Sequence, residues 1–282
     1  MFINKLTLTT EGNELAFIIN QKRTCYNGIY PFKIFPDMGL KELEFSPITV
    51  LYGSNGSGKS TLMNIIAEKA KIIRHSAFSN SPFFNDYVKM CKLKYSEIPH
   101  ASQIITSDDV SDFLLNIRYL NDGIEVRRNE LFEEYLSRKY ADHRLKSLED
   151  YDEWKENLNA QRSSQSEFVR NRLMRDVEMR SNGETAMRYY VERINENAVY
   201  LIDEPENSLS ASLQLKLAEY ILQSAKYFNC QFIISTHSPF FLSLDGAKIY
   251  NLDSRPVKES KWTELENVKV YHDFFKTHEK EF

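Results

Sequence analysis

The chain has 282 residues, of which 42% are hydrophobic and 27% are charged, and its formal net charge is −4. These values fit one large α/β domain, alone or with a subdomain, and give no global electrostatic argument for binding nucleic acid. The apolar runs are far shorter than the roughly 20 residues of a bilayer-spanning helix, and the N-terminus lacks signal-peptide features. The three cysteines are far apart and form no metal-ligand pattern. We therefore expect a cytoplasmic location without membrane insertion.

The N-terminal third is predicted to be β-rich. Residues 2–10 and 14–20 read as two antiparallel strands, and residues 40–53 as two more, separated at Pro47. After Gly58, apolar residues recur at helical spacing, which predicts a helix. Residues 75–100 contain Ser-Asn-Ser-Pro and Ile-Pro breaks and are expected to be a loop.

The middle of the chain differs in composition. A short strand is expected at 103–106, then a helix from Asp108 and a turn at Asn121-Asp122-Gly123. Residues 125–180 hold 12 Lys/Arg and 13 Asp/Glu with no Gly or Pro, which predicts helices, interrupted near 159–166. We expect three segments: an N-terminal part at 1–100, an inserted helical lobe at 101–180 and a C-terminal part at 181–282.

The C-terminal part alternates between strands and helices. An amphipathic helix is expected at 184–196, and another helix at 211–227. Apolar runs at 198–203, 230–236 and 248–252 predict buried strands. This order predicts an α/β fold with a mostly parallel sheet covered by helices on both faces. The last 28 residues are polar with isolated aromatics and carry little signal.

The sequence "GSNGSGKST" (53–61) matches the pattern G-x-x-x-x-G-K-[ST] between a predicted strand and a predicted helix. Glycines let the backbone N–H groups face phosphate oxygens, and the helix N-terminus adds positive potential. Lys59 would reach the β- and γ-phosphates, Ser60 would ligate Mg²⁺, and Thr61 would lie near the α-phosphate. A glycine-rich turn is the structural alternative, which this context disfavours. The predicted nucleotide-binding loop consists of Gly53, Ser54, Asn55, Gly56, Ser57, Gly58, Lys59, Ser60 and Thr61.

Two acids follow the apolar run in "VYLIDEPENSLS" (199–210). Asp203 ends a predicted buried strand, at the sheet edge where α/β proteins bind ligands, and would hold Mg²⁺. Glu204 would point to the other side of the strand end and polarise an attacking water. A solvated acidic loop is the alternative, and the phosphate loop makes it less favoured.

The sequence "FIISTHSP" (232–239) places His237 after a third apolar strand. Its distance from Asp203 fits one helix and one neighbouring strand, which would bring His237 beside the nucleotide. There it would contact the γ-phosphate or the attacking water. A structural histidine at a strand end is the alternative.

Together, "GSNGSGKST", "LIDEPENSLS" and "STHSP" resemble the nucleotide-binding domain of the ABC ATPase superfamily. Within it, Asn55-Gly56 and Glu204-Pro205 resemble the SMC/RecF-like soluble branch and the small AAA-type ATPases of prokaryotic genome-maintenance and defence loci. The resemblance covers about residues 1–75 and 180–252. It implies ATP hydrolysis with Mg²⁺ as cofactor.

The resemblance also implies a glutamine that contacts Mg²⁺ and the attacking water. Gln103 is the candidate for this metal contact, with Gln161 and Gln165 as alternatives. An aromatic residue is expected against the adenine ring. The candidates are Tyr26, Tyr30 and Phe32, and the sequence does not choose between them.

The family signature, of the type Ser-x-Gly-Gly-Gln, is matched only as Ser181-x-Gly183-Glu184. The spacing of Ser181 and Glu184 is also that of a capping box, which opens a helix and leaves orphan N–H groups at its positive end. In the family this element closes over the γ-phosphate held by a second subunit, and residues 207–209 lie across the contact. The resemblance therefore implies an ATP-dependent head-to-tail homodimer with composite sites.

Three functions remain open. The first is an ATPase switch that engages DNA or controls an effector protein, such as a nuclease or toxin, in genome maintenance or antiviral defence. The second is the ATP-binding subunit of a membrane transporter, and the third is a nucleotide sensor without turnover. A basic cluster near the end of the helical lobe could bind DNA. Acids at 167, 176 and 178 balance its charge, so a solvated helix face is favoured instead. The cluster consists of Arg170, Arg172, Arg175 and Arg180.

Overall fold

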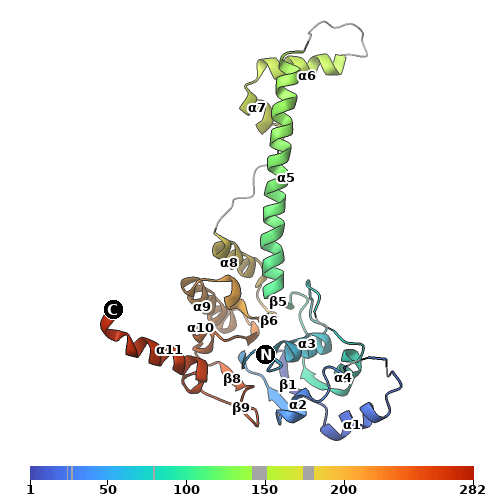
Figure 1. Ribbon diagram of the computed structural model, residues 1–282, viewed down its shortest axis with the longest axis vertical. Helices are drawn as coiled ribbons and strands as arrows, with labels where there is room; N and C mark the ends of the chain where they lie inside the picture. The colour runs from blue at the N-terminus through green and yellow to red at the C-terminus, as the bar shows by residue number, and fades with distance from the viewer. Residues whose placement is uncertain (24, 27, 79, 142–150, 174–180) are drawn as a thin grey trace. The chain divides into compact units, whose positions relative to one another are not determined.

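The computed structural model describes the chain except for residues 24, 27, 79, 142–150 and 174–180 (Figure 1). It divides into a core unit, made of Met1–Ser111 and Asn182–Phe282, and a helical unit, Asp112–Ser181. The insertion therefore starts later than the expected residue 101, because residues 103–106 pair with the core sheet. Within the described part of the chain, no helix combines the length and apolarity needed to cross a membrane.

A six-stranded sheet forms the centre of the core unit. Its strand order is β5 (Gln103–Thr106), β6 (Val199–Asp203), β7 (Gln231–Ser235), β3 (Ile48–Tyr52), β8 (Lys248–Asn251) and β9 (Lys258–Glu259). The first five strands are parallel, and β9 is antiparallel. Strands β3 and β7 are buried along their whole length, which explains why they read as continuous apolar runs. The predicted mostly parallel sheet is confirmed.

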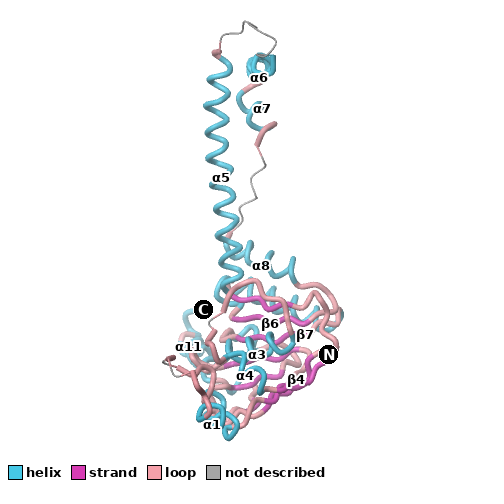
Figure 2. Tube along the Cα trace, turned by 90° about the vertical axis from the view of Figure 1, so that its right-hand side faces the viewer, coloured by secondary structure: helices cyan, strands magenta, loops and turns pink. Residues whose placement is uncertain are grey.

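A smaller antiparallel sheet has the order β2 (Glu42–Glu44), β1 (Ile3–Thr7) and β4 (Lys92–Tyr95). Helix α3 (Lys59–Ala70) contacts β4 of this sheet as well as β6 and β7 of the large one (Figure 2). Its buried residues therefore run round most of the helix. The side chain of Gln231 joins the two sheets, because its amide donates to Ile3 O at 2.7 Å and accepts from Ile3 N at 2.8 Å.

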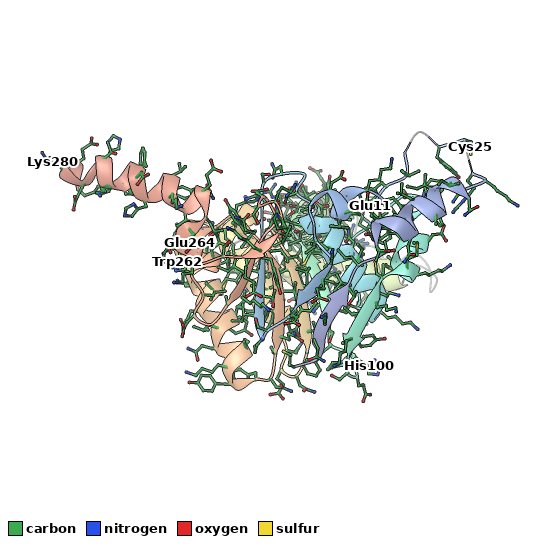
Figure 3. The ribbon with its side chains drawn as sticks, turned by 90° about the horizontal axis from the view of Figure 1, so that it is seen from below. Glu11, Cys25, His100, Trp262, Glu264 and Lys280 are labelled. Atoms are coloured by element: carbon green, nitrogen blue, oxygen red, sulfur yellow. The ribbon has the colours of Figure 1, made fainter. Side chains whose placement is uncertain are left out.

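The core unit also contains other helices, of which α11 projects outward (Figure 3). They are α1 (Glu11–Ile19), α2 (Ile34–Asp37), α4 (Phe84–Met90), α8 (Asn182–Arg193), α9 (Ala211–Tyr227), α10 (Pro239–Leu242) and α11 (Glu266–Thr277). Short 3₁₀-helices occupy Pro205–Ser208 (η1), Trp262–Glu264 (η2) and Glu279–Glu281 (η3). Helix α11 begins after Trp262 and Glu264 and leads toward Lys280 (Figure 3). The polar C-terminal tail is thus an ordered part of the core unit.

The helical unit contains the greater part of α5 (Ser107–Lys139), followed by α6 (Tyr151–Arg162) and α7 (Gln165–Arg170). Leu131, Tyr135 and Phe168 form its small core together with Ala160 and Val169. Ser164 caps α7 by accepting from Glu167 N, so the predicted break near 159–166 is confirmed. Most described residues of this segment are helical, as expected, whereas 140–141 and 171–173 form turns or bends.

Three local predictions are wrong. Residues 14–20 lie mostly in helix α1, whose N-cap Thr10 accepts from Asn13 N, rather than in a strand. Residues 75–100 contain α4 and β4 rather than only loop. The expected turn at Asn121-Asp122-Gly123 lies inside α5, where a glycine is tolerated at a cost of about 1 kcal/mol relative to alanine.

Candidate active site

The loop at residues 53–58 connects β3 to α3. Gly56 and Gly58 have φ angles of 83° and 88°, in the left-handed region that other residues rarely adopt. A Cβ on Gly53 would lie 2.5 Å from Ser57 Oγ, so the loop is also closely packed on itself. Asp253 fixes its start, because the carboxylate accepts from Ser54 N at 2.7 Å and from Ser54 Oγ at 2.8 Å.

Lys59 is the first residue of α3, and its side chain is only 4% exposed. Its Nζ donates to Gly53 O at 2.7 Å and to Ser54 O at 3.3 Å, and lies 2.9 Å from His237 Nε2. Burial lowers the pKa of Lys59, and the nearby carboxylates of Glu204 and Asp203 act in the opposite direction. The ammonium is therefore held at the loop, where a phosphate would bind.

Asp203 is the last residue of β6, and it lies between Thr106 of β5 and Ser235 of β7 in the sheet register. Its Oδ1 is buried and has no hydrogen-bond partner among the described residues. Burial raises the pKa of Asp203, while the hydroxyls of Ser235 and Ser60 lower it. Within the site, this carboxylate oxygen and Ser57 Oγ are both buried polar atoms without a partner among the described residues, so each could accept a ligand.

Glu204 has a left-handed backbone with φ 50°, a conformation that costs a non-glycine residue about 1–3 kcal/mol. Its N–H donates to Ser235 O at 2.9 Å, which holds this geometry. Its Oε1 lies 3.9 Å from Lys59 Nζ and 4.0 Å from His237 Nε2. Its Oε2 accepts from Asn207 Nδ2 at 3.0 Å. The strained turn thus aims the carboxylate at the lysine.

His237 follows β7, and its Nε2 reaches the same lysine. Its N–H donates to Glu206 Oε1 at 2.6 Å, and its carbonyl accepts from Asn267 Nδ2 at 2.8 Å. The structure therefore brings together Lys59, Glu204 and His237, as expected from the sequence.

The donor set near Asp203 fits a magnesium ion. Mg²⁺ is usually held by one or two carboxylates or hydroxyls, with waters and substrate phosphates completing its shell. The unpartnered Oδ1 of Asp203 and the Ser60 hydroxyl supply those groups. Among the residues that the structure describes, no cluster of three or more His, Cys, Asp or Glu side chains forms an alternative metal site.

Gln103 does not reach this site. It pairs with Tyr200 at the start of the strand, whereas Thr106 pairs with Asp203 at the other end. Its Nε2 donates to Arg193 O at 2.9 Å. The proposed metal role of Gln103 is therefore corrected. Its alternatives Gln161 and Gln165 belong to the helical unit.

Tyr30 is the aromatic residue placed at the phosphate loop. Its hydroxyl lies 2.8 Å from Thr61 Oγ1, and its side chain lines a pocket of about 450 Å³ with residues 55–61 and Glu204. Phe32 is instead buried and stacks on Phe17. Tyr26 packs against Phe83. The structure thus distinguishes three candidates that the sequence left equal.

Ser181, Gly183 and Glu184 do not line this pocket. Gly183 and Glu184 lie in the first turn of α8, which contacts η1 and α9. A Cβ on Gly183 would lie 2.8 Å from Leu213 Cδ1, so the glycine permits this packing. In the basic cluster, Arg172 pairs with Glu156, while positions 175 and 180 lie outside the described residues.

Three residues were missed by the sequence reasoning: Asp253, Glu206 and Asn267. Glu206 lies in the segment "DEPENSLS" (203–210), in the first turn of η1. A third acid so close to Asp203 and Glu204 could have marked it as a candidate. Asp253 and Asn267 lie in a polar region where sequence alone offered none.

Two family models and a curated protein match parts of this sequence. A family model described as "ABC transporter" matches residues 41–207, and one described as "AAA ATPase domain" matches residues 184–242. The tungstate uptake system ATP-binding protein TupC of Campylobacter jejuni is 24% identical over 255 residues, covering 83% of this chain and 67% of that protein.

Two solved structures also match the chain. The Smc head domain with an extended coiled coil, bound to the C-terminal domain of ScpA and derived from Pyrococcus furiosus, has 15% identity and a TM-score of 0.46, covering 97% of this chain and 99% of that one. The SMC head domain from Thermotoga maritima has 15% identity and a TM-score of 0.40, covering 93% and 99%.

Proposed function

Because the chain belongs to the ABC transporter family of ATPases, whose model spans residues 41–207, we propose that it is a molecular switch that pairs on binding ATP and reopens on hydrolysis. One observation supports the catalytic part most directly. The Nζ of Lys59 lies within 4.0 Å of both Glu204 Oε1 and His237 Nε2, although the three residues come from separate parts of the sequence.

The residues have complementary roles in this proposal. Lys59 exchanges its carbonyl partners for the β- and γ-phosphates, and the loop N–H groups bind the same oxygens. Glu204 accepts a proton from the attacking water, and His237 orients that water or the γ-phosphate. Tyr30 lies against the adenine ring.

Ser60 and Asp203 would hold Mg²⁺, which neutralises phosphate charge when it is bound. The buried Asp203 carboxylate supports this assignment because it has no other described partner for Oδ1.

The pairing part rests on the start of α8. A helix N-terminus is the positive end of the helix dipole, which suits a phosphate. Ser181 adds a hydroxyl, while Gly183 lets Leu213 of the same chain pack closely against the start of α8. In a head-to-tail dimer this element of one subunit would cover the phosphate loop of the other. Asn207, in the segment expected at the subunit contact, donates its amide to Glu204. This hydrogen bond would link the contact between subunits to the catalytic carboxylate.

Sizing and turnover test this proposal together. Glu204→Gln should abolish phosphate release and accumulate an ATP-bound dimer. Adding Ser181→Arg should abolish that dimer while ATP binding by the monomer changes by less than about twofold. Ser164→Arg is the matched control, because it makes the same substitution at a serine that caps α7 in the helical unit, and loss of that cap should cost only about 1 kcal/mol.

The outcomes separate the two parts. A protein that releases phosphate but stays monomeric with ATP at every concentration would refute homodimerisation while leaving hydrolysis intact. Undiminished phosphate release by Glu204→Gln would refute the assigned catalytic role. Absence of turnover in the unmodified chain would support the nucleotide-sensor alternative.

We propose that the output is DNA engagement or control of an effector such as a nuclease or toxin, in genome maintenance or defence. ATPase stimulation by DNA, or copurification of such an effector, tests it. The similarity to TupC favours a second candidate, the ATP-binding subunit of an uptake system. Copurification of a membrane permease instead would support that candidate.

A further inference from the structure

The backbone of His237 is held from two sides by side chains that lie far from it in sequence. Glu206 of η1 accepts the His237 N–H at 2.6 Å, and Asn267 of α11 donates to the His237 carbonyl at 2.8 Å. Both polar groups of one residue are thus satisfied outside any strand or helix ladder. This arrangement fixes the position of the Cα from which the imidazole extends.

The residues on either side of His237 are also held by side chains of other elements. Thr236 Oγ1 donates to Glu206 Oε2 at 2.8 Å, so the Glu206 carboxylate binds two successive residues. Ser238 Oγ donates to the Gln214 side chain at 2.7 Å. The loop after β7 is therefore attached to η1, α9 and α11 along three consecutive residues.

Asn267 itself is fixed at the first turn of α11. Its N–H donates to Tyr52 OH at 3.2 Å, and the Tyr52 ring packs edge-on against the His237 ring with centroids 6.2 Å apart. Tyr52 ends β3, directly before the phosphate loop. Helix α11 is thus bonded to the strand that carries the loop as well as to the histidine.

We propose that Glu206 and Asn267 are positioning residues, which act through His237 and keep its Nε2 directed at the phosphate-loop lysine. The proposal rests on the proposed function, because it assumes that His237 contributes to hydrolysis. It adds a role for the C-terminal helix α11 in turnover, through an amide that would not touch nucleotide.

The physical reason is the sensitivity of catalysis to geometry. A displacement of about 1 Å can reduce a rate by about 100-fold. Loss of either backbone hydrogen bond would let the loop relax, whereas the phosphate loop and its binding groups would stay in place. The variants should therefore lower kcat more than they raise the KM for ATP.

The test compares Asn267→Ala, Glu206→Ala and Glu206→Gln in the full chain. Asn20→Ala is the matched control, since its amide also donates to a backbone carbonyl at 2.8 Å, in α1. We expect Asn267→Ala and Glu206→Ala to lower kcat by about 10-fold or more, with KM changed by less than about twofold. Glu206→Gln keeps an acceptor for the His237 N–H and should retain most of the activity.

A double-mutant cycle shows whether the effect passes through His237. In a His237→Ala background, Asn267→Ala should have almost no further effect on the residual rate. NMR of the histidine ring protons provides a measurement independent of turnover. Asn267→Ala should shift the His237 resonance of the folded protein, and Asn20→Ala should leave it unchanged.

An equal rate loss from Asn267→Ala in both backgrounds, or an unshifted His237 resonance, would overturn the positioning role. A His237→Ala variant with full turnover would instead refute the function assigned to the histidine. The two failures are therefore distinguishable. A melting curve for each variant identifies any loss that comes from unfolding.

Discussion

Asp203→Asn should stabilise the protein without nucleotide while abolishing magnesium-dependent turnover. The wild-type carboxylate is buried, and its Oδ1 lacks a described hydrogen-bond partner. An asparagine has nearly the same shape but no charge to desolvate. Its amide could also donate to Ser235 Oγ, which lies close enough to lower the pKa of the wild-type carboxyl. Removal of the carboxylate therefore relieves a local cost of folding.

The magnitude follows from two opposing effects. An unsatisfied buried polar group costs about 1–3 kcal/mol, and more when it is charged. In the opposite direction, the Ser235 and Ser60 hydroxyls and the Lys59 ammonium stabilise the ionised Asp203, and the substitution weakens these interactions. We expect a net gain of about 1–2 kcal/mol, which corresponds to a rise in Tm of about 2–8 °C for a domain of about 200 residues.

The pH dependence has a definite sign. Burial raises the pKa of Asp203 above its ordinary value of 3.8, so the folded state binds the proton more tightly than the unfolded state. The free energy of unfolding of the wild type consequently falls as the pH rises between the two pKa values. The advantage of Asp203→Asn should be smallest at acid pH and should level off once the folded carboxyl is ionised.

Thermal melts with and without Mg²⁺ and ATP provide the assay. The variant should melt higher without ligand, and it should gain less from Mg²⁺ and ATP than the wild type does. Asp245→Asn is the matched control, because it removes the same charge from an exposed aspartate. A Tm for Asp203→Asn at or below the wild-type value at neutral pH would refute the reasoning.

Three other substitutions test separate parts of the structure. Gly53→Ala places a Cβ 2.5 Å from Ser57 Oγ and should weaken binding of a fluorescent ATP analogue by about 10-fold or more. Gly12→Ala, with nothing within 4 Å, is its control, and equal affinities would contradict the packing argument. Leu131→Ala leaves a cavity in the core of the helical unit and should destabilise that unit by about 2–5 kcal/mol. Hydrogen exchange should therefore increase in α5 and α6, while ATP affinity is retained. Unchanged exchange would contradict the role of Leu131 in this core. Glu14→Gln should raise the urea midpoint of unfolding at pH 7, because burial destabilises the charged form of Glu14 and raises its pKa above 4.5. The stabilisation should decrease as the pH is lowered toward 4.5. A stabilisation that does not change with pH would contradict this explanation.

Sequence predicted the large sheet well because its parallel strands are buried on both faces. Each such strand appears as an apolar run, and the carboxyl ends of parallel strands meet at one edge. Lys59, Glu204 and His237 follow three of these strands, so their convergence could be anticipated without coordinates.

Strand register and long-range packing could not be read in the same way. Gln103 is the first residue of β5, which lies beside the strand that carries Asp203. Only the register shows that Thr106, at the other end of β5, is the residue paired with Asp203. The apolar residues at 14–20 suit either a strand or a helix, and their surroundings decide. Asn267 is 30 positions from His237 in a polar tail, where nothing local signals a contact.

Several groups of the site are unfavourable before a nucleotide binds. Lys59 is buried with a lowered pKa, Asp203 has an unpartnered oxygen, and Glu204 has a left-handed backbone. Phosphates and Mg²⁺ would compensate the first two by supplying charge of the opposite sign, while the third directs the carboxylate into the site. Local rules of folding therefore fail where a ligand restores the balance, which is typical of a functional site. For the same reason, substitutions that stabilise the nucleotide-free protein here should weaken its function, whereas Glu14→Gln, at a residue that does not line the pocket, should stabilise without that loss.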